Sequence, residues 1–270
     1  MMIQRLNTLM ITGLLSVSAA LAQFNITDFS GAGSSLFLNN DAAIVGSVLR
    51  VAPASGWQRG SAYYFQKQHL SLPGGWTTTF RFRLSNPGGI LNGGADGFAF
   101  VIQDNSPSAL GSDAGGFMGY SLIARSLAVE FDTWYNSMFD DPDDNHVAVH
   151  TQWTLPNYPD NTTLLGQVTP GFILKDGNSH TATITYDGSG QLSISLDGNH
   201  VLTVTFDHNT YLSILDASGF AWIGFTSATG SAWQDHDILE WSFMPVPEPA
   251  SCVAIGAGLI GLMLRRRKVG

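Results

Sequence analysis

The sequence predicts an all-β protein in which two antiparallel sheets pack face to face as one sandwich. Short runs of alternating apolar and polar residues follow one another between turn residues, and no stretch has the period of a convincing amphipathic helix. Charged residues make up only 12% of the 270-residue chain, whereas glycine (30 residues) and aromatic residues (11%) are abundant, which favours tight turns around an apolar core. No linker interrupts residues 24–244 and no repeat of solenoid or propeller length is present, so one sandwich is the simplest arrangement.

Two strands are expected early in the chain, at residues 60–72 and 76–84. Alternation in the second strand assigns three large apolar side chains to the core face, namely Phe80, Phe82 and Leu84. Two turns rich in glycine, at residues 87–89 and 92–94, are expected to lead the chain into the strand that contains Asp96.

The plainest strand signals lie in residues 178–206. Three alternating runs occur there, and they are separated by an Asp-Gly-Ser-Gly turn after Tyr186 and by an Asp-Gly turn after Leu196. Short turns of this composition join neighbouring antiparallel strands. The segment therefore predicts a three-stranded meander.

Residues 126–150 combine apolar strands with acidic residues. Glu130 and Asp132 fall on one face of the first strand because side chains of a strand repeat every two residues. An acidic loop follows, and His146 opens a second alternating run that ends at His150. One interpretation is a solvated acidic turn between two hairpin strands. That interpretation does not explain two carboxylates within an apolar strand, since unpaired carboxylates are rarely buried, and a divalent-cation site is favoured.

The residue types in this segment suit two neighbouring cations. An ion that accepts a nitrogen ligand would bind Glu130, Asp132, Asp141 and His146. An oxygen-seeking ion such as calcium would bind through Asp132, Asp141, Asn136 and the backbone carbonyl of Trp134. Because two carboxylates are shared, the ions would lie about 4 Å apart. The other histidines, His69, His150, His180, His200 and His208, have no clustered partners in the sequence and receive no role.

The N-terminus predicts export. Arg5, an apolar run over residues 9–21, and Ala20 and Ala22 around a cleavage point are typical of a signal peptide that spans residues 1–22. Residues 23–247, which would remain after processing of both ends, hold 20 acidic and 7 basic residues, a net charge of −13. This domain lacks the basic surface of nucleic-acid-binding proteins, so no nucleic-acid partner is expected.

The C-terminal tail, residues 245–268, combines a Pro-Glu-Pro motif, an apolar stretch over residues 251–264 and a basic cluster at residues 265–268. The apolar stretch has about 15 residues, fewer than the roughly 20 of a relaxed membrane span, and the basic cluster would stay cytoplasmic. A transient membrane anchor is expected, and a permanent anchor without processing is the alternative. The only cysteine, Cys252, lies in this tail, so the exported domain has no disulfide and depends on its core and its ions.

The acidic segment resembles the metal-binding segment of legume-type (L-type) lectins, and the spacing of its six presumed ligands is similar to that of the concanavalin branch of that family. The resemblance runs from about Phe29 to Phe243. It is carried by motifs in the family's order, at residues 95–100, 115–119, 129–146, 224–230 and 236–243. It implies a concanavalin-like jelly-roll sandwich over residues 23–244, and a secreted sugar-binding protein that uses Ca²⁺ and a transition metal, with Mn²⁺ the expected ion.

The resemblance also implies a sugar site. Asp96 would follow a cis peptide bond after Ala95 and accept hydrogen bonds from two sugar hydroxyls, and Asn136 would turn its amide nitrogen to the sugar and its oxygen to calcium. The remaining contacts would come from the N–H of Gly116, a stacking face on Trp134, and Ser231 and Ala232. The loop at residues 231–235 fits the family in length but not in residues, and Trp233 and Gln234 are candidates to extend the site.

The tail resembles the PEP-CTERM sorting signal of Gram-negative bacteria, which an exosortase-type enzyme is thought to recognise and remove. This resemblance implies an exported protein in the periplasm, on the outer surface or in the extracellular matrix, with a glycan or exopolysaccharide as its partner.

Alternatives from other classes are a matrix scaffold with purely structural metals, a glycoside hydrolase on the same fold, and a two-metal hydrolase. The fold hosts β-glucanases with two catalytic carboxylates on one strand, but Trp134 stands where the second glutamate would be, so no acid/base pair at hydrolytic spacing remains. No nucleophile or general base stands beside the cluster either. The sequence therefore predicts a binding protein rather than an enzyme.

Overall fold

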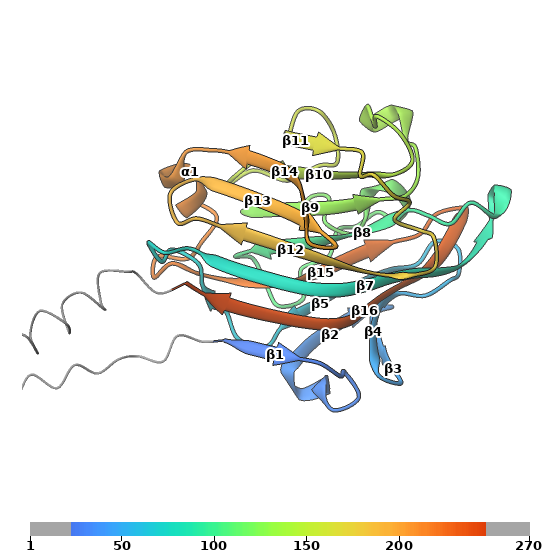
Figure 1. Ribbon diagram of the computed structural model, residues 1–270, viewed down its shortest axis with the longest axis horizontal. Coiled ribbons are helices and arrows are strands. Elements are labelled where there is room, and N and C mark those ends of the chain that lie inside the picture. The colour runs from blue at the N-terminus through green and yellow to red at the C-terminus, as the bar shows by residue number, and fades with distance from the viewer. Residues whose placement is uncertain (1–22, 247–270) are drawn as a thin grey trace, which may run out of the picture.

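The computed structural model describes residues 23–246, so the expected signal peptide (residues 1–22) and nearly all of the expected tail lie outside the described residues. Two antiparallel sheets pack face to face in the described part of the chain, as Figure 1 shows. The predicted all-β sandwich is confirmed.

The first sheet, called the back sheet here, runs in the order β14-β13-β12-β7-β16-β4-β3, and β1 pairs with β16 beside this path. Its strands are β1 (Phe24–Ile26), β3 (Ala43–Val45), β4 (Val48–Ala52), β7 (Trp76–Gly89), β12 (Ser179–Tyr186), β13 (Gln191–Leu196), β14 (Asn199–Thr205) and β16 (Ala232–Pro245). The meander predicted for residues 178–206 is confirmed as β12, β13 and β14, each paired antiparallel with the next.

The second sheet, called the front sheet here, runs in the order β11-β10-β9-β8-β15-β5-β2, with β6 paired to β15. Its strands are β2 (Leu36–Asn40), β5 (Arg59–Tyr64), β6 (Gln68–His69), β8 (Gly97–Gln103), β9 (Ser126–Asp132), β10 (His146–Thr151), β11 (Leu164–Val168) and β15 (Phe220–Ala228).

Helices are short. The 3-10 turns are η1 (Ala32–Ser35), η2 (Ile90–Asn92), η3 (Gly115–Phe117) and η4 (Ser137–Phe139), and the α-helix is α1 (His208–Leu212). The side chain of Asp207 caps α1 by accepting a hydrogen bond from the N–H of Thr210 at 2.7 Å. Within residues 23–246 no helix has the length and apolarity needed to cross a membrane.

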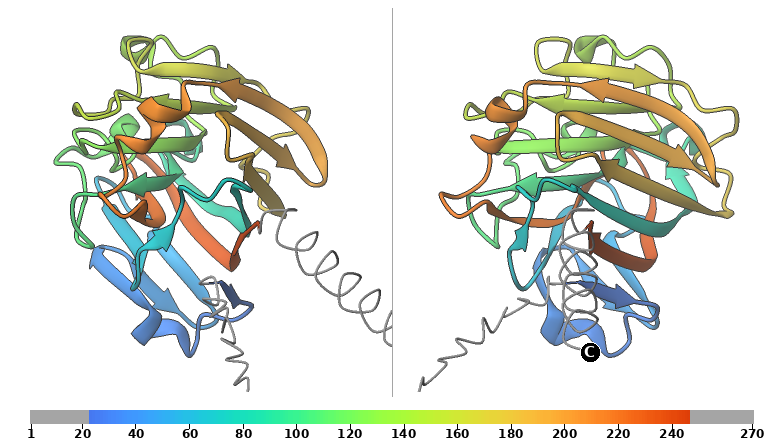
Figure 2. Two further views of the ribbon diagram at one scale, coloured as in Figure 1. Left: turned by 90° about the vertical axis from the view of Figure 1, so that its left-hand side faces the viewer. Right: turned by 60° about the vertical axis from the view of Figure 1, so that its left-hand side comes forward.

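Figure 2 shows the two sheets from other sides. An aromatic core fills the space between them. Phe80, Phe82 and Leu84 of β7 are fully buried, as alternation predicted. The ring of Phe80 meets those of Phe98, Phe131 and Phe225 from the front sheet edge to face, with centroids 5.0–6.1 Å apart. These contacts join the strand that begins after Asp96 to the strand that carries Glu130 and Asp132, so the core aligns the two.

The outer face of the front sheet is covered as well. Every residue of β8, β9 and β10 is buried, because loop residues such as Met118, Tyr120 and Ile123 pack on the side that faces away from the back sheet. Side chains on both faces of β9 are therefore buried. The carboxylates of Glu130 and Asp132 lie on the outer face and are excluded from solvent.

Two strand predictions need correction. Residues 60–72 do not form one strand: β5 ends at Tyr64, and Lys67 in the break pairs with Asp104 and Asp216 at 2.5 and 2.9 Å. Residues 87–89 do not form a turn either, because β7 continues to Gly89. The pairing of β7 with β16 shifts register between Trp233 and Asp235, and a bulge of this kind accommodates a proline within a strand.

We expect Phe80→Ala to lower the free energy of unfolding by about 3–5 kcal/mol, because it leaves a cavity where both sheets meet. Urea denaturation followed by tryptophan fluorescence measures this loss. Phe37→Ala is the control, since that ring is 41% exposed and its removal should cost far less. Equal losses for the two variants would contradict the role given to the aromatic core.

Candidate functional site

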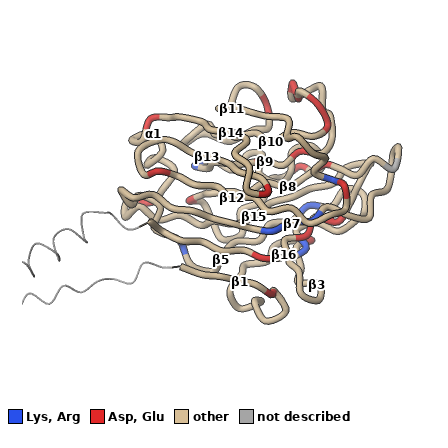
Figure 3. The backbone as a smooth tube through the Cα atoms, in the orientation of Figure 1, with Lys and Arg blue, Asp and Glu red and all other residues tan. Residues whose placement is uncertain are grey.

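The candidate site lies at the end of the sandwich that faces away from both ends of the described chain, on the right in Figure 1. Strand pairing brings its parts together: Asp132, the last residue of β9, lies opposite both Gly97 of β8 and His146 of β10. Acidic residues occupy several loops at this end, as Figure 3 shows. The sequence segments around Asp96, Asp132 and His146 thus meet at one place.

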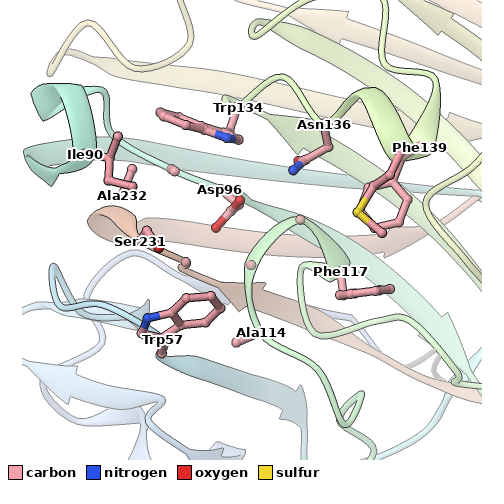
Figure 4. Close-up of a pocket in the computed structure, with 15 residues that line it drawn as sticks. Trp57, Ile90, Asp96, Ala114, Phe117, Trp134, Asn136, Phe139, Ser231 and Ala232 are labelled. Atoms are coloured by element: carbon pink, nitrogen blue, oxygen red, sulfur yellow. The ribbon is translucent and has the colours of Figure 1, made fainter.

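A cavity of about 360 Å³ opens at this end. All six residues predicted for the sugar site line it: Asp96, Gly116, Trp134, Asn136, Ser231 and Ala232. Figure 4 shows Asp96 at its centre, with Trp134 and Asn136 on one side and Ser231 on the other. The structure therefore gathers residues from four separate segments around a single cavity, although their roles in binding stay a prediction.

Asp96 is held rigidly at the floor of this cavity. The peptide bond between Ala95 and Asp96 is cis, as the resemblance implied. The carbonyl of Asp96 accepts hydrogen bonds from the N–H and the hydroxyl of Thr133 at 2.8 and 3.0 Å. The side chain is 4% exposed, and its Oδ2 has no hydrogen-bond partner in the described part of the chain. Burial raises the pKa of Asp96 to about 7, and the charge of Asp141 adds to this effect.

Asn136 and Gly116 face each other across the cavity wall. A Cβ atom on Gly116 would lie 2.4 Å from Oδ1 of Asn136, so a side chain at this position would displace the Asn136 amide. Figure 4 shows the amide nitrogen of Asn136 turned toward Asp96. Its Oδ1 is buried and has no hydrogen-bond partner among the described residues. A buried amide oxygen of this kind is open to a cation or a donor that the protein itself does not supply.

The apolar part of the lining was found only in part by sequence reasoning. Trp134 forms one wall, where its ring packs against Gly93. The structure adds several side chains to which the sequence analysis gave no role, namely Trp57, Ile90, Phe117, Met138 and Phe139. They come from loops, where the sequence has no alternating pattern. The signal that could have indicated them is the presence of aromatic or apolar residues in a loop.

Trp233 and Gln234 were candidates to extend the site, and that expectation was wrong. The ring of Trp233 packs against Gly56, Gly88 and Gly89, and Gln234 is buried with its Nε2 donating to the hydroxyl of Thr133 at 2.9 Å. Neither lines the cavity. Both side chains therefore pack against neighbouring segments and support the loop from behind.

Next to this cavity, Glu130, Asp132 and His146 offer ligand atoms that all lie within 4.8 Å of one another. The three side chains are at most 2% exposed. Nδ1 of His146 lies 3.2 Å from the carbonyl of Asp143, and donation to that carbonyl leaves the lone pair of Nε2 free for a metal ion. This donor set of two carboxylates and an imidazole suits a first-row transition metal.

Glu130 has more partners than the sequence suggested. Its Oε1 lies 3.1 Å from Nε2 of His150 and 3.5 Å from Nε2 of His146, and Tyr120 donates its hydroxyl to Oε2 at 2.6 Å. The small residue Ala148 pairs directly with Glu130, which leaves room for the histidines on either side of it. Burial alone would raise the pKa of Glu130, but the charges and hydrogen bonds of His150 and His146 outweigh it and lower that pKa.

The expectation that the other histidines lack partners was therefore wrong for His150. It was also wrong for His180, which lies between Asp197 at 2.8 Å and Asp176 at 3.1 Å. Period-two alternation from His146 to His150 was the available signal for the first. No local pattern links His180 to Asp197, since the contact arises from the pairing of β12 with β13.

Asp132 and Asp141 remain without a basic partner within the described residues. Asp132 accepts a hydrogen bond from the N–H of Trp134 at 2.7 Å, and Asp141 accepts one from the N–H of Asn136 at 2.6 Å. Burial, with the charges of Glu130 and Asp141, raises the pKa of Asp132 well above its ordinary value, and burial raises the pKa of Asp141 to about 6. Clustered, buried carboxylates of raised pKa are what a divalent cation stabilises.

Of the four ligands expected at the transition-metal position, Glu130, Asp132 and His146 lie together and fit such an ion, whereas Asp141 lies outside that group. The calcium position would use Asp132 and Asp141 with two oxygens of the loop between them, the Asn136 amide oxygen and the Trp134 carbonyl. The orphaned Oδ1 of Asn136 supports the second position directly.

Comparison with known proteins assigns most of the chain to one family. The family profile described as legume lectin domain matches residues 21–253, and that of the PEP-CTERM protein-sorting motif matches residues 245–268. The 2-acetamido-2-deoxy-D-galactose-binding seed lectin 2 of Cytisus scoparius is 28% identical over 249 residues, which cover 82% of this chain and 94% of the lectin. The L-type lectin-domain containing receptor kinase VIII.2 of Arabidopsis thaliana is 30% identical over 190 residues, 68% of this chain but only 26% of that longer protein.

Solved structures agree on the fold. Lectin II from Ulex europaeus superposes with a TM-score of 0.66 at 22% identity, over 83% of this chain and 97% of the lectin. The exoplasmic domain of VIP36, in its Ca²⁺- and mannose-bound form, gives a TM-score of 0.64 at 18% identity, over 82% of this chain and 88% of that domain. The jelly-roll sandwich implied by the sequence resemblance is confirmed.

Adding Ca²⁺ and Mn²⁺ to chelator-treated protein is expected to raise its melting temperature, by an amount equivalent to about 2.7 kcal/mol when the cations stand 100-fold above their Kd. Asp132→Asn should lose this response. Without metal, Asp132→Asn should be at least as stable as the wild type, because it removes one of three clustered negative charges. Differential scanning fluorimetry with and without EDTA measures both effects.

Asp140→Asn is the matched control, since Asp140 is an exposed acid in the same loop and should leave the metal response intact. A wild-type protein whose melting temperature ignores both EDTA and added cations would contradict the assignment.

Proposed function

We propose that this chain, which belongs to the legume lectin domain family, binds carbohydrate in the cavity around Asp96. The observation that carries the proposal is the unpartnered, buried Oδ2 of Asp96 on the floor of an open cavity. A carboxylate oxygen without a partner is costly, and a ligand rich in hydroxyl groups removes that cost. The apolar walls beside it suit the C–H faces of a sugar ring.

The residues around Asp96 divide the work of binding. Asp96 accepts hydrogen bonds from two sugar hydroxyls, and such bonds to an ionised acceptor are the stronger kind. Asn136 donates from its amide nitrogen and Gly116 from its backbone N–H, while Trp134 supplies an apolar surface for the ring. Ser231 and Ala232 close the opposite side. Glu130 has no part in contacting sugar, because it is buried and engaged by Tyr120, His146 and His150.

Ca²⁺ and a transition metal, Mn²⁺ in this proposal, are the cofactors. When bound, the two cations would supply positive charge to the carboxylates of Asp132 and Asp141. Those carboxylates accept hydrogen bonds from the backbone of Trp134 and Asn136. An ordered acidic loop would therefore hold the side chains of Trp134 and Asn136 in place. The positive charge of the cations would also lower the pKa of Asp96 and keep its carboxylate ionised at neutral pH. Sugar binding thus depends on the cations without direct contact.

The two ends of the chain supply the location. We propose that residues 1–22 are removed on export, that residues 23–244 form the lectin domain, and that residues 245–268 anchor it transiently in the membrane. The match of the PEP-CTERM motif supports recognition of the tail by an exosortase-type enzyme and an exported protein of a Gram-negative bacterium. The ligand is then a glycan or an exopolysaccharide of the periplasm, outer surface or extracellular matrix.

Asp96→Asn is expected to lower affinity for the bound glycan about 10- to 100-fold, because the amide keeps only one acceptor oxygen and one of the two hydrogen bonds, worth about 1.5–3 kcal/mol, is lost. A glycan array identifies the ligand, with galactose, N-acetylgalactosamine and mannose among its probes, and isothermal titration then gives the affinities. Asp113→Asn is the control, because Asp113 is exposed and does not line the cavity. Unchanged affinity in Asp96→Asn, with the fold intact, would place the sugar elsewhere.

For the tail, we expect protein recovered from the exterior of its native host to lack the basic cluster at residues 265–268. The reason is that cleavage near the Pro-Glu-Pro motif separates the domain from its anchor. Intact-mass spectrometry of the exported pool measures the C-terminus. A full-length C-terminus throughout that pool would favour the permanent anchor instead.

A further inference from the structure

Trp57 lies in the loop between β4 and β5, and its side chain lines the same cavity as Asp96 and Trp134. Figure 4 shows it on the side of Asp96 opposite to Trp134, next to Ser231 and Ala114. Its side chain is 67% exposed. No sequence motif and no role derived above includes this residue.

The position of Trp57 is fixed by hydrogen bonds rather than left to a free loop. Its N–H donates to the carbonyl of Gly230 at 3.1 Å. The hydroxyl of Thr229 accepts from the N–H of Gln58 at 2.9 Å and donates to the carbonyl of Ser55 at 2.6 Å. The loop around Trp57 is thereby joined to the segment that leads directly into Ser231, so the two move as one unit.

The backbone of Trp57 adds a second indication. Its φ of +62° lies in the left-handed region, which residues with a side chain rarely adopt. A residue in this region persists only where its surroundings hold it, and such residues gather at binding sites. Here the bond to Gly230 holds the backbone while the indole stays in water beside the cavity.

An exposed indole in a loop held by hydrogen bonds can stack against the apolar face of a ligand. Aromatic rings with one apolar side and one wet edge are typical of recognition sites, because they supply contact area with little loss of conformational freedom. Two of the polar groups assigned to the first sugar, Asp96 and Asn136, lie farther from Trp57 than Ser231 does in Figure 4. Trp57 is therefore an exposed part of the cavity lining, displaced from the polar groups assigned to the first sugar.

We infer that Trp57 forms a second aromatic platform, and that the site binds a glycan chain through at least two consecutive sugar units. The first unit occupies the polar floor beside Trp134, and the second lies over the indole of Trp57. This inference rests on the proposed function. It assigns to Trp57 the extension that the sequence had suggested for Trp233 and Gln234.

The test compares wild type, Trp57→Ala and Trp57→Tyr on one glycan array that carries each terminal monosaccharide both alone and at the end of longer chains. For the terminal sugar that the wild type recognises, Trp57→Ala should bind the chains about tenfold more weakly, as expected for loss of a large apolar contact. Binding of the isolated monosaccharide should stay within about twofold, which is near the smallest change such an assay resolves. Trp57→Tyr should restore most of the preference for chains.

Saturation-transfer NMR on the bound oligosaccharide gives an independent reading. Protons of the second sugar unit should receive saturation from the wild type and lose it in Trp57→Ala. Phe65→Ala is the control for removal of a partly exposed aromatic ring, because Phe65 is 39% exposed and lies outside the cavity lining.

Two results would overturn the inference alone: equal losses for monosaccharide and chains in Trp57→Ala, which would place one sugar between both indoles, or no loss for either. A wild type that binds no glycan on the array would instead overturn the proposed function, and the inference with it.

Discussion

Three carboxylates, Glu130 and Asp132 buried on β9 and Asp141 partly buried in the loop that follows, impose the constraint on which the site depends. Glu130 is balanced by two histidines and a tyrosine. Asp132 and Asp141 are balanced only by backbone N–H groups within the described residues, and those groups belong to Trp134 and Asn136. The contacts that lessen the repulsion between the carboxylates therefore also set the positions of Trp134 and Asn136, two residues of the proposed sugar site.

The aromatic core controls the same site from the opposite face of the sheet. Phe131 of β9 stacks on Phe98 of β8 with centroids 4.7 Å apart and planes 2° from parallel. The two residues are also paired across the strands, and the next pair along is Gly97 with Asp132. Register set by packing in the core thus fixes how far Asp96 lies from the carboxylate cluster. A slip of one residue would exchange the two faces of β9 and turn the side chains of Glu130 and Asp132 toward the core.

Sequence reasoning succeeded where the residue types follow the two-residue alternation of a strand or mark a turn. Alternation placed Glu130 and Asp132 on one face of β9, and it placed Phe80 and Phe82 on the core face of β7. Turn chemistry located the β12–β14 meander. It failed where tertiary contacts decide. Trp57 is held beside the cavity by its bond to Gly230 and by the bonds of Gln58 and Ser55 to Thr229, far away in the chain. Gln234 was misplaced because its outward or inward direction depends on a register shift between β16 and β7 that no local pattern reveals.

The loops of the site are joined to one another without a covalent link, since the only cysteine lies in the tail. Buried polar side chains take that role. Gln234 donates to Thr133, and Thr133 donates to the carbonyl of Asp96, so three loops share one chain of hydrogen bonds. Thr229 connects a fourth loop, the one that carries Trp57. Each of these bonds is buried or nearly so, where losing one partner is costly. A cation at the acidic loop would therefore act on all four loops, because none of them can shift without breaking a bond to its neighbour.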